Sequence, residues 1–161
     1  MSVIFNKFDC FVQDMGRKAH DLNADTLMIL LTNTAPVAGD TVVDTTGGVC
    51  VVKGVSNGNE VAAASGYVKN GAQVAANAYT QASGLAKLVG TKIVWTAGAA
   101  IGPFQYAVLY NITAGAAATR PVIGWWNYGA SISLAIGETF TIGNSNDGTD
   151  WTTTYPILSN Q

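Results

Sequence analysis

The segment that decides the fold is Ile101–Ile142, IGPFQYAVLYNITAGAAATRPVIGWWNYGASISLAIGETFTI. Its first part, up to Asn111, alternates in the two-residue period of an extended strand. The side chains expected on one face are Phe104, Tyr106, Val108 and Tyr110, with Ala107 and Leu109 on the other. Because both faces carry apolar side chains, the sequence predicts a strand that is covered on both sides.

A second strand with two apolar faces is expected over 121–128, PVIGWWNY. The expected faces are Val122, Gly124, Trp126 and Tyr128 on one side, and Ile123 and Trp125 on the other. Gly129-Ala130 is expected to turn the chain into a third strand with one wet face over Ile132–Ile136. Gly137-Glu138 is then expected to turn it again, into Thr139–Ile142.

Short strands joined by glycine turns lack the long crossovers that parallel pairing requires, so the sequence predicts an antiparallel meander. A sheet with two covered faces needs a second layer. The predicted fold class is therefore all-β, an antiparallel β-sandwich or barrel of jelly-roll-like type. Further strands are expected at Thr26–Thr32, which is apolar throughout and suits a central position, at Val42-Val43, at Val49–Val52 and at Ile93–Thr96, where Ile93 and Trp95 should point inward.

The N-terminal segment Phe5–Leu22 has a different period. Apolar side chains recur at spacings of three and four, which predicts a short amphipathic helix; they are Phe5, Phe8, Val12, Met15, Ala19 and Leu22. Two roles stay open for this helix: closing one side of the sandwich, or docking as an arm on a neighbouring subunit. The 161 residues suit a single domain, with residues 1–23 as helix or arm and 24–161 as the β-sandwich.

Charge is scarce in this chain. Only 11% of the residues are charged, against about 25% in an average protein, and such a surface suits packing against other chains. A net charge of −2 and a pI near 5.1 leave no basic field for nucleic acid. No apolar run approaches the roughly 20 residues of a membrane-spanning helix and no signal peptide is recognisable, so we expect neither nucleic acid nor membrane as a partner, and folding in a cytoplasm.

The sequence predicts no enzyme. The single histidine, His20, lies on the expected helix, away from any nucleophile motif. Glu60 and Glu138 are the only glutamates, and a paired-carboxylate glycosidase is the one enzymatic alternative that the composition leaves open. No phosphate-binding loop and no Cys or His metal spacing is present, so no cofactor and no metal are expected. Cys10 and Cys50 have apolar neighbours and are expected as unpaired thiols.

Two further patterns have competing interpretations. Asn144–Asp150 offers several oxygens, as a calcium loop does, but Asn-Asp-Gly is also a common turn, and the turn is favoured. Trp125 and Trp126 are adjacent, so they point to opposite faces of the strand. We expect one in the core and the other facing the second layer or a partner, in preference to a sugar-binding platform.

Six segments carry a family resemblance: NKFDCFVQD (6–14), DTLMILLTNTAP (25–36), SGY (65–67), IGPFQYAVLYN (101–111), VIGWWNYG (122–129) and GETFT (137–141). In this order and spacing they resemble a family of small structural proteins of tailed bacteriophages. The resemblance spans nearly the whole chain and implies a virion component. One departure is Val42–Glu60, which looks longer here.

Two functions are therefore expected. The first is a capsid decoration (cement) protein, a homo-oligomer with a trimer favoured, that binds the major capsid protein in the virion and stabilises the head shell. Its expected subunit or shell contacts are Phe5, Phe8, Val12, Met15, Trp125 and Trp126. The alternative is a tail-tip or fibre module that binds a host surface glycan through exposed aromatic side chains.

Overall fold

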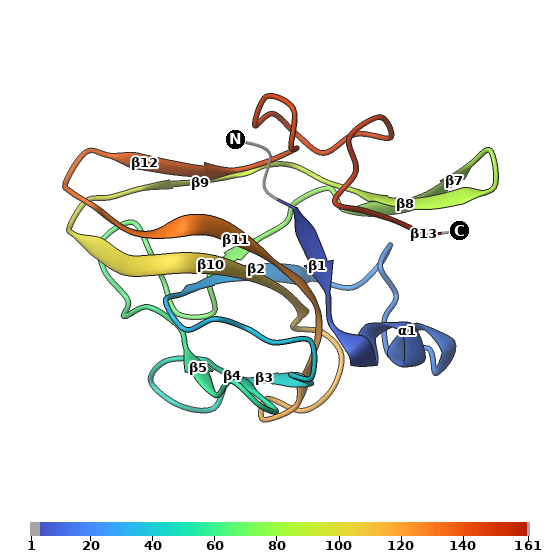
Figure 1. The fold of residues 1–161 in the computed structure, drawn as a ribbon, viewed down its shortest axis with the longest axis horizontal. Coiled ribbons are helices and arrows are strands. Elements are labelled where there is room, and N and C mark those ends of the chain that lie inside the picture. Colours follow the sequence, from blue (N-terminus) through green and yellow to red (C-terminus); the bar gives the residue numbers. More distant parts are fainter. Residues whose placement is uncertain (1–3, 161) are drawn as a thin grey trace.

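The computed structural model describes residues 4–160 of the chain, without the side chains of Ala82 and Asn160 (Figure 1). The chain forms antiparallel sheets and one short helix, so the predicted all-β class is confirmed. In order, the elements are β1 (Phe5–Lys7), α1 (Asp9–Gly16), β2 (Leu27–Thr32), β3 (Val42–Asp44), β4 (Val51–Lys53), β5 (Gly58–Asn59), β6 (Ala72–Gln73), β7 (Ala78–Ala82), β8 (Leu85–Val89), β9 (Ile93–Thr96), β10 (Ile101–Asn111), β11 (Arg120–Leu134), β12 (Thr139–Ile142) and β13 (Leu158–Asn160).

The main sheet is built around the long pair β10–β11. Its strand order is β5-β4-β3-β11-β10-β2-β6, and β1 also pairs with β11. The strand β2 lies along β10, from Thr32 opposite Tyr106 to Leu27 opposite Asn111. Among the described residues this order ends at β5 and β6, so the sheet does not close into a barrel.

Along Ala107–Tyr110 and Pro121–Trp126 both faces of the pair β10–β11 are covered, as the apolar side chains on both faces predict. On one side, β9–β12 and β7–β8–β13 form a second layer, which lies along the top of Figure 1. The larger apolar cluster fills the space between the layers, with Leu109, Trp95 and Leu88 among its members. On the other side, the hairpin β3–β4 and Phe8 cover Val108 and its neighbours in a second cluster. The molecule is therefore a two-layer sandwich. The end of the main sheet that carries β3 and β4 folds back over the face of β10–β11 that the second layer leaves open.

The strands expected at 26–32, 42–43, 49–52 and 93–96 are present as β2, β3, β4 and β9. In β9 the side chains of Ile93 and Trp95 are buried while Val94 and Thr96 are exposed, as predicted. The segment 139–142 is also a strand, β12, but it pairs with β9 and not with the strand before it. The prediction of a simple meander over the whole of 101–142 is therefore wrong.

The expected turn at Gly129-Ala130 is also wrong. These residues lie within β11, which runs without a break to Leu134. The pairing of β10 with β11 is irregular there, because Tyr106 lies opposite Asn127 and Phe104 lies opposite Ile132. Gly129 has a φ of 94°, in the left-handed region that favours glycine, so it forms part of a bulge and not of a reversal.

The same irregularity changes the face of Phe104. The alternation predicts Phe104 beside Val108 and Tyr110, but Phe104 joins the larger cluster with Leu109, while the other two join the second cluster. A register shift between Phe104 and Tyr106 interrupts the two-residue period. Alternation thus fails across a bulge.

The predicted faces of Val122 and Ile123 in β11 are also wrong. Val122 joins Trp125 in the second cluster, and Ile123 joins Trp126 in the larger one. Another register shift, between Leu109 and Tyr110, interrupts the alternation there.

The helix is shorter than the predicted Phe5–Leu22. Residues 5–7 form β1 and pair with Gly124–Trp126 of β11, and α1 spans only Asp9–Gly16. Lys18, with a φ of 60°, leaves the helical conformation just after its end. The side chains that face inward are Phe8, Phe11 and Met15, whereas Val12 of the predicted stripe is 67% exposed.

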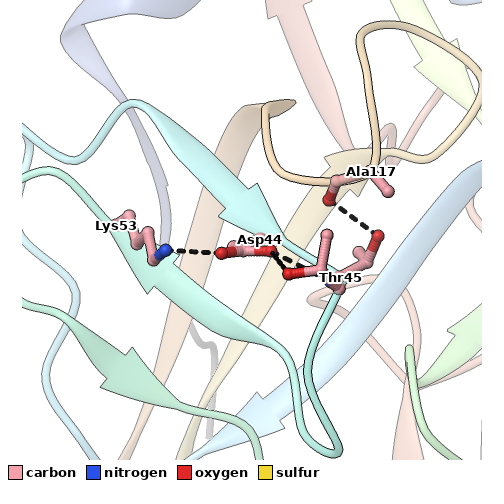
Figure 2. Close-up of polar contacts among 5 residues, drawn as sticks. Asp44, Thr45, Lys53 and Ala117 are labelled. Atoms are coloured by element: carbon pink, nitrogen blue, oxygen red, sulfur yellow. Dashed lines mark hydrogen bonds and ion pairs between the residues drawn. The ribbon is translucent and has the colours of Figure 1, made fainter.

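Polar side chains hold the hairpin β3–β4 and the loop 112–119 in place. Figure 2 shows the carboxylate of Asp44 paired with the ammonium of Lys53, and Thr45 beside Ala117. The amide and the hydroxyl of Thr45 both donate to the carbonyl of Ala117, at 2.7 and 2.8 Å. Hydrogen bonds from Lys53 and Thr46 hold the pKa of Asp44 well below its usual range. The charge-assisted pair thus links the two strands of the hairpin. The contact of Thr45 with Ala117 joins the hairpin to a loop that lies 72 residues further along the chain.

The pairing of β1 with β11 depends on Gly124. A Cβ at this position would lie 2.4 Å from the carbonyl oxygen of Asn6 and 2.3 Å from the ring of Phe5. We therefore predict that Gly124→Ala displaces β1 from β11, with a loss of roughly 1–3 kcal/mol in the free energy of unfolding. Hydrogen exchange of the amides of residues 5–8, together with urea unfolding, measures both effects.

Gly48→Ala is the matched control, because a Cβ at Gly48 meets nothing within 4 Å. It should leave exchange in β1 unchanged. Equal protection of β1 in the two variants would contradict the close packing at Gly124.

Candidate functional site

The structure places the six expected contact residues in two different environments. Phe8 (1% exposed) and Trp126 (6%) are buried within the chain, and Phe5, Met15 and Trp125 are half-buried. Val12 is the one of the six whose side chain is exposed. Most of these residues therefore pack the N-terminal segment against the main sheet. Val12 lies instead on the outer side of α1.

The two adjacent tryptophans point to opposite faces of β11, as alternation predicts. Trp126 lies between Phe5 and Trp151, with ring centroids 4.8 and 6.0 Å away. Trp125 lies against Phe8 at 4.5 Å, in the second cluster. Both indoles are thus held by aromatic neighbours from the N-terminal segment.

A groove with a volume of about 530 Å³ opens beside Trp126. This size falls within the range of about 300–1,000 Å³ that ligand pockets occupy. One side is formed by β1 and the residue before it, the floor by β10 and β11, and the other side by β12 and the loops that follow it. In Figure 1 these loops, coloured red, lie beside the start of β1. Seven aromatic residues line this aromatic groove: Phe5, Phe104, Tyr106, Trp126, Tyr128, Phe140 and Trp151.

The irregular pairing of β10 with β11 positions the aromatic side chains of the groove. Tyr128 lies in the bulge between Asn127 and Ile132, and its ring meets Phe140 of the second layer edge-on at 5.8 Å. Phe104, turned inward by the same register shift, meets Phe140 at 4.9 Å. The bulge thus turns two aromatic side chains of the main sheet toward β12.

Asp147 is the only charged residue in the lining of this groove, as far as the described residues show. Its Oδ1 accepts hydrogen bonds from the amide and the hydroxyl of Thr149 and from the side chain of Asn144, at 3.0, 2.7 and 2.9 Å. These bonds lower the pKa of Asp147, so its carboxylate is ionised at neutral pH. The groove therefore combines aromatic rings with one fixed negative charge.

The loop 143–150 is organised by the side chain of Asn144. Its Oδ1 accepts hydrogen bonds from the amides of Asn146 and Asp147, and its Nδ2 donates to Asp147, Thr149 and the carbonyl of Asp150. The side-chain oxygen of Asn144 and Oδ1 of Asp147 are thus engaged within the loop, which favours the turn over the calcium site. Within residues 4–160 no cluster of three or more His, Cys, Asp or Glu side chains is placed to hold a metal ion.

The carboxylate of Glu60 is buried, away from the groove. Glu60 accepts hydrogen bonds from the amide of Cys50 at 2.9 Å and from the hydroxyl of Tyr67 at 2.8 Å. The same hydroxyl accepts from the amide of Leu31 at 2.9 Å. Because every contact of Glu60 is to a structural group in the core, we assign it to the fold. Glu138 lies far along the chain in an exposed turn, where it accepts from the amide of Ala135.

His20 is buried at the junction of α1 with the main sheet. Its Nδ1 lies 3.3 Å from the side-chain nitrogen of Asn111, which also donates to Asp25 at 2.6 Å. The oxygen of the Asn111 amide accepts from the amides of Thr113 and Ala114, so the amide orientation is fixed. Nδ1 of His20 therefore accepts a hydrogen bond, and the ring is neutral.

The two cysteines are unpaired, as predicted. Burial raises the pKa of the Cys10 thiol to about 11 and that of Cys50 to about 12. Both are therefore protonated at neutral pH, when a thiol is a poor nucleophile. No helix in the described part of the chain is long and apolar enough to span a membrane.

Comparisons with known protein families, with curated proteins and with solved structures find no match to this chain. The aromatic groove is thus identified from its geometry alone. The alternation along β11 correctly places Trp126 and Tyr128 on one face. Sequence reasoning missed the contribution of Phe140 and Trp151, because no local pattern brings their segments to this face.

The burial of His20 predicts a specific pH dependence of stability. Burial lowers the pKa of this imidazole below its ordinary value of 6.5, although Asp14 and Asp25 act in the opposite direction. The unfolded chain then binds more protons than the folded one as the pH falls below 6.5, so stability decreases. Above pH 6.5 the contribution is fully present.

Urea unfolding between pH 7.5 and 5 measures this effect, and His20 is the only histidine in the chain. We predict a falling free energy of unfolding below about pH 6.5, with a slope of at most about 1.4 kcal/mol per pH unit for one proton. His20→Gln should remove most of the slope. A flat profile in the unsubstituted protein would show that the imidazole is not buried as described.

Proposed function

We propose that this chain is a non-enzymatic structural protein of a bacteriophage virion. In this proposal it is a capsid decoration (cement) protein, which forms a homo-oligomer, with a trimer favoured, and binds the major capsid protein on the head shell. The observation that carries the proposal is a surface with few charged residues and several exposed apolar side chains. Within the described residues nine large apolar or aromatic side chains are exposed: Ile4, Val12, Val37, Val55, Val68, Val94, Tyr128, Ile136 and Tyr155.

Such a surface suits a protein that functions in contact with others. Single exposed apolar residues are normal, but here they occur on a chain with only 18 charged residues among 161. A subunit that binds a repetitive shell in many copies gains affinity from avidity, so each contact can be small. A closed homo-oligomer multiplies these contacts further.

The phage resemblance supports the same proposal. The segments 25–36, 101–111 and 122–129 that carry it contain β2, β10 and most of the first half of β11. These strands are the centre of the main sheet. The residues that resemble phage structural proteins are therefore those that set the architecture.

The outer side of α1 is the proposed contact region. Phe8 and Phe11 are buried and Met15 packs against the core, so the helix is fixed to the body of the protein. Val12 points away from that core. A rigid helix with an exposed apolar side chain offers a preformed contact with a low entropy cost on binding.

Reattachment to shells tests this proposal. Heads that lack the chain are mixed with purified protein, sedimented, and assayed for bound protein and for the temperature at which they release DNA. We predict saturable binding and a higher release temperature. Val12→Glu should weaken binding about tenfold or more, because the interface would have to bury a charge.

Val68→Glu is the matched control, since Val68 has the same exposed fraction of 67% and lies outside α1. It should bind as the unsubstituted protein does. No binding of the unsubstituted protein to shells would contradict the proposed function, and equal binding of the two variants would contradict the assignment of α1.

The glycan-binding alternative receives less support. A sugar ring needs an accessible aromatic face, and Trp126 is covered by Phe5 and Trp151. Trp125 lies half-buried against Phe8. The packing of both indoles therefore favours a structural role for them.

A further inference from the structure

We propose that the aromatic groove binds an extended segment of a partner protein and takes up a lysine or arginine side chain from it. This inference rests on the proposed function, in which the partner is the major capsid protein. It assigns to the groove a role that is separate from the contact on the outer side of α1.

The residues that line the groove favour a positively charged side chain as its occupant. The faces of aromatic rings carry a negative potential and attract cations within about 6 Å. Of the seven aromatic residues in the lining, Phe5, Tyr106, Tyr128 and Phe140 keep exposed surface, whereas the other three are buried. The lining also has one carboxylate, on Asp147, and no Lys, Arg or His among the described residues. A cationic side chain is complementary to both features, whereas an anionic one is repelled.

The carboxylate of Asp147 is held ready for such a partner. Oδ1 is engaged by Thr149 and Asn144, which fixes the orientation of the group. Oδ2 makes no hydrogen bond to any described residue, so it is available to an incoming ammonium or guanidinium. A charge fixed before binding loses little entropy when the pair forms.

The backbone along the groove favours an extended occupant. Phe140, Thr141 and Ile142 of β12 line it. Within the described residues β12 pairs with β9 on one side and with no strand on the other. An unpaired strand edge offers main-chain donors and acceptors to an added strand. An incoming segment can thus bond to β12 while its basic side chain reaches the rings and Asp147.

Small peptides test the inference directly. The probes are the acetylated and amidated pentapeptides Ala-Val-Lys-Val-Ala and the same sequence with norleucine or glutamate in place of lysine. Norleucine keeps most of the aliphatic chain and removes the charge. The intrinsic fluorescence of the protein, to which Trp126 and Trp151 in the lining of the groove contribute, reports binding. We predict saturable binding of the lysine peptide and at least tenfold weaker binding of the other two.

Asp147→Asn is the decisive variant. An asparagine keeps an oxygen that accepts the bonds from Asn144 and Thr149, so the loop should retain its structure, and an unchanged midpoint of urea unfolding checks this. The variant should bind the lysine peptide about tenfold more weakly. Asp150→Asn is the matched control, because it removes the same charge from the same loop at a residue outside the groove, and it should change binding less than twofold.

The outcomes separate this inference from the proposed function. Equal binding of the lysine and norleucine peptides, or equal effects of the two variants, would overturn the inference even if the protein still attaches to shells. Binding of n-butylammonium as tight as that of the lysine peptide would overturn the role of β12. If the protein binds the lysine peptide selectively but does not attach to shells, the proposed ligand of the groove is supported and the decoration function is contradicted.

Discussion

The antiparallel pairing of β10 with β11 is the constraint on which the rest of the structure depends. Over Ala107–Tyr110 and Pro121–Trp126 these strands carry apolar side chains on both faces, so neither face can remain in water there. Burial of apolar area at about 25 cal/mol per Å² is the main gain in free energy on folding. The second layer covers one face, and the curled hairpin β3–β4 with Phe8 covers the other. The N-terminal segment is part of this arrangement and not a separate arm, because Phe5 and Phe8 lie against Trp126 and Trp125.

Irregularity within that pairing produces the candidate site. A perfectly regular ladder would keep Phe104 on the face of Val108 and would leave no room for a bulge at Tyr128. The register shifts bring Phe104 and Tyr128 to the edge of the second layer, where both meet Phe140. Bulges are common at functional positions because they re-aim side chains without breaking the sheet. The fold and the groove therefore have the same physical origin.

Local patterns predicted the elements better than their connections. Alternation was sufficient for Ala107–Tyr110 of β10 and for the inward side chains of β9, because burial on one face imposes a two-residue period. In β11 it correctly gave Trp125 and Trp126 opposite faces, but it placed Val122 and Ile123 on the wrong ones. It failed at Phe104 and at Gly129, since a bulge leaves no mark in the periodicity. The three-and-four spacing predicted a helix, but Phe5 pairs with β11, and tertiary pairing overrides a local helical period. No clear two-residue alternation marks the hairpin β7–β8, since alanine, serine and glycine make up much of residues 78–89. The groove could not be predicted, as its sides come from segments far apart in the sequence.

The proposed function joins these features into one account: a rigid sandwich, a surface with few charges, a helix that presents Val12, and a groove suited to a basic side chain. The central claim is that the chain covers the head shell. Quantitative mass spectrometry of purified virions, with this chain measured against the major capsid protein, tests that claim most directly. The account predicts a copy number comparable to that of the major capsid protein and in a fixed ratio to it. A few copies per particle would contradict it and would place the protein on the tail.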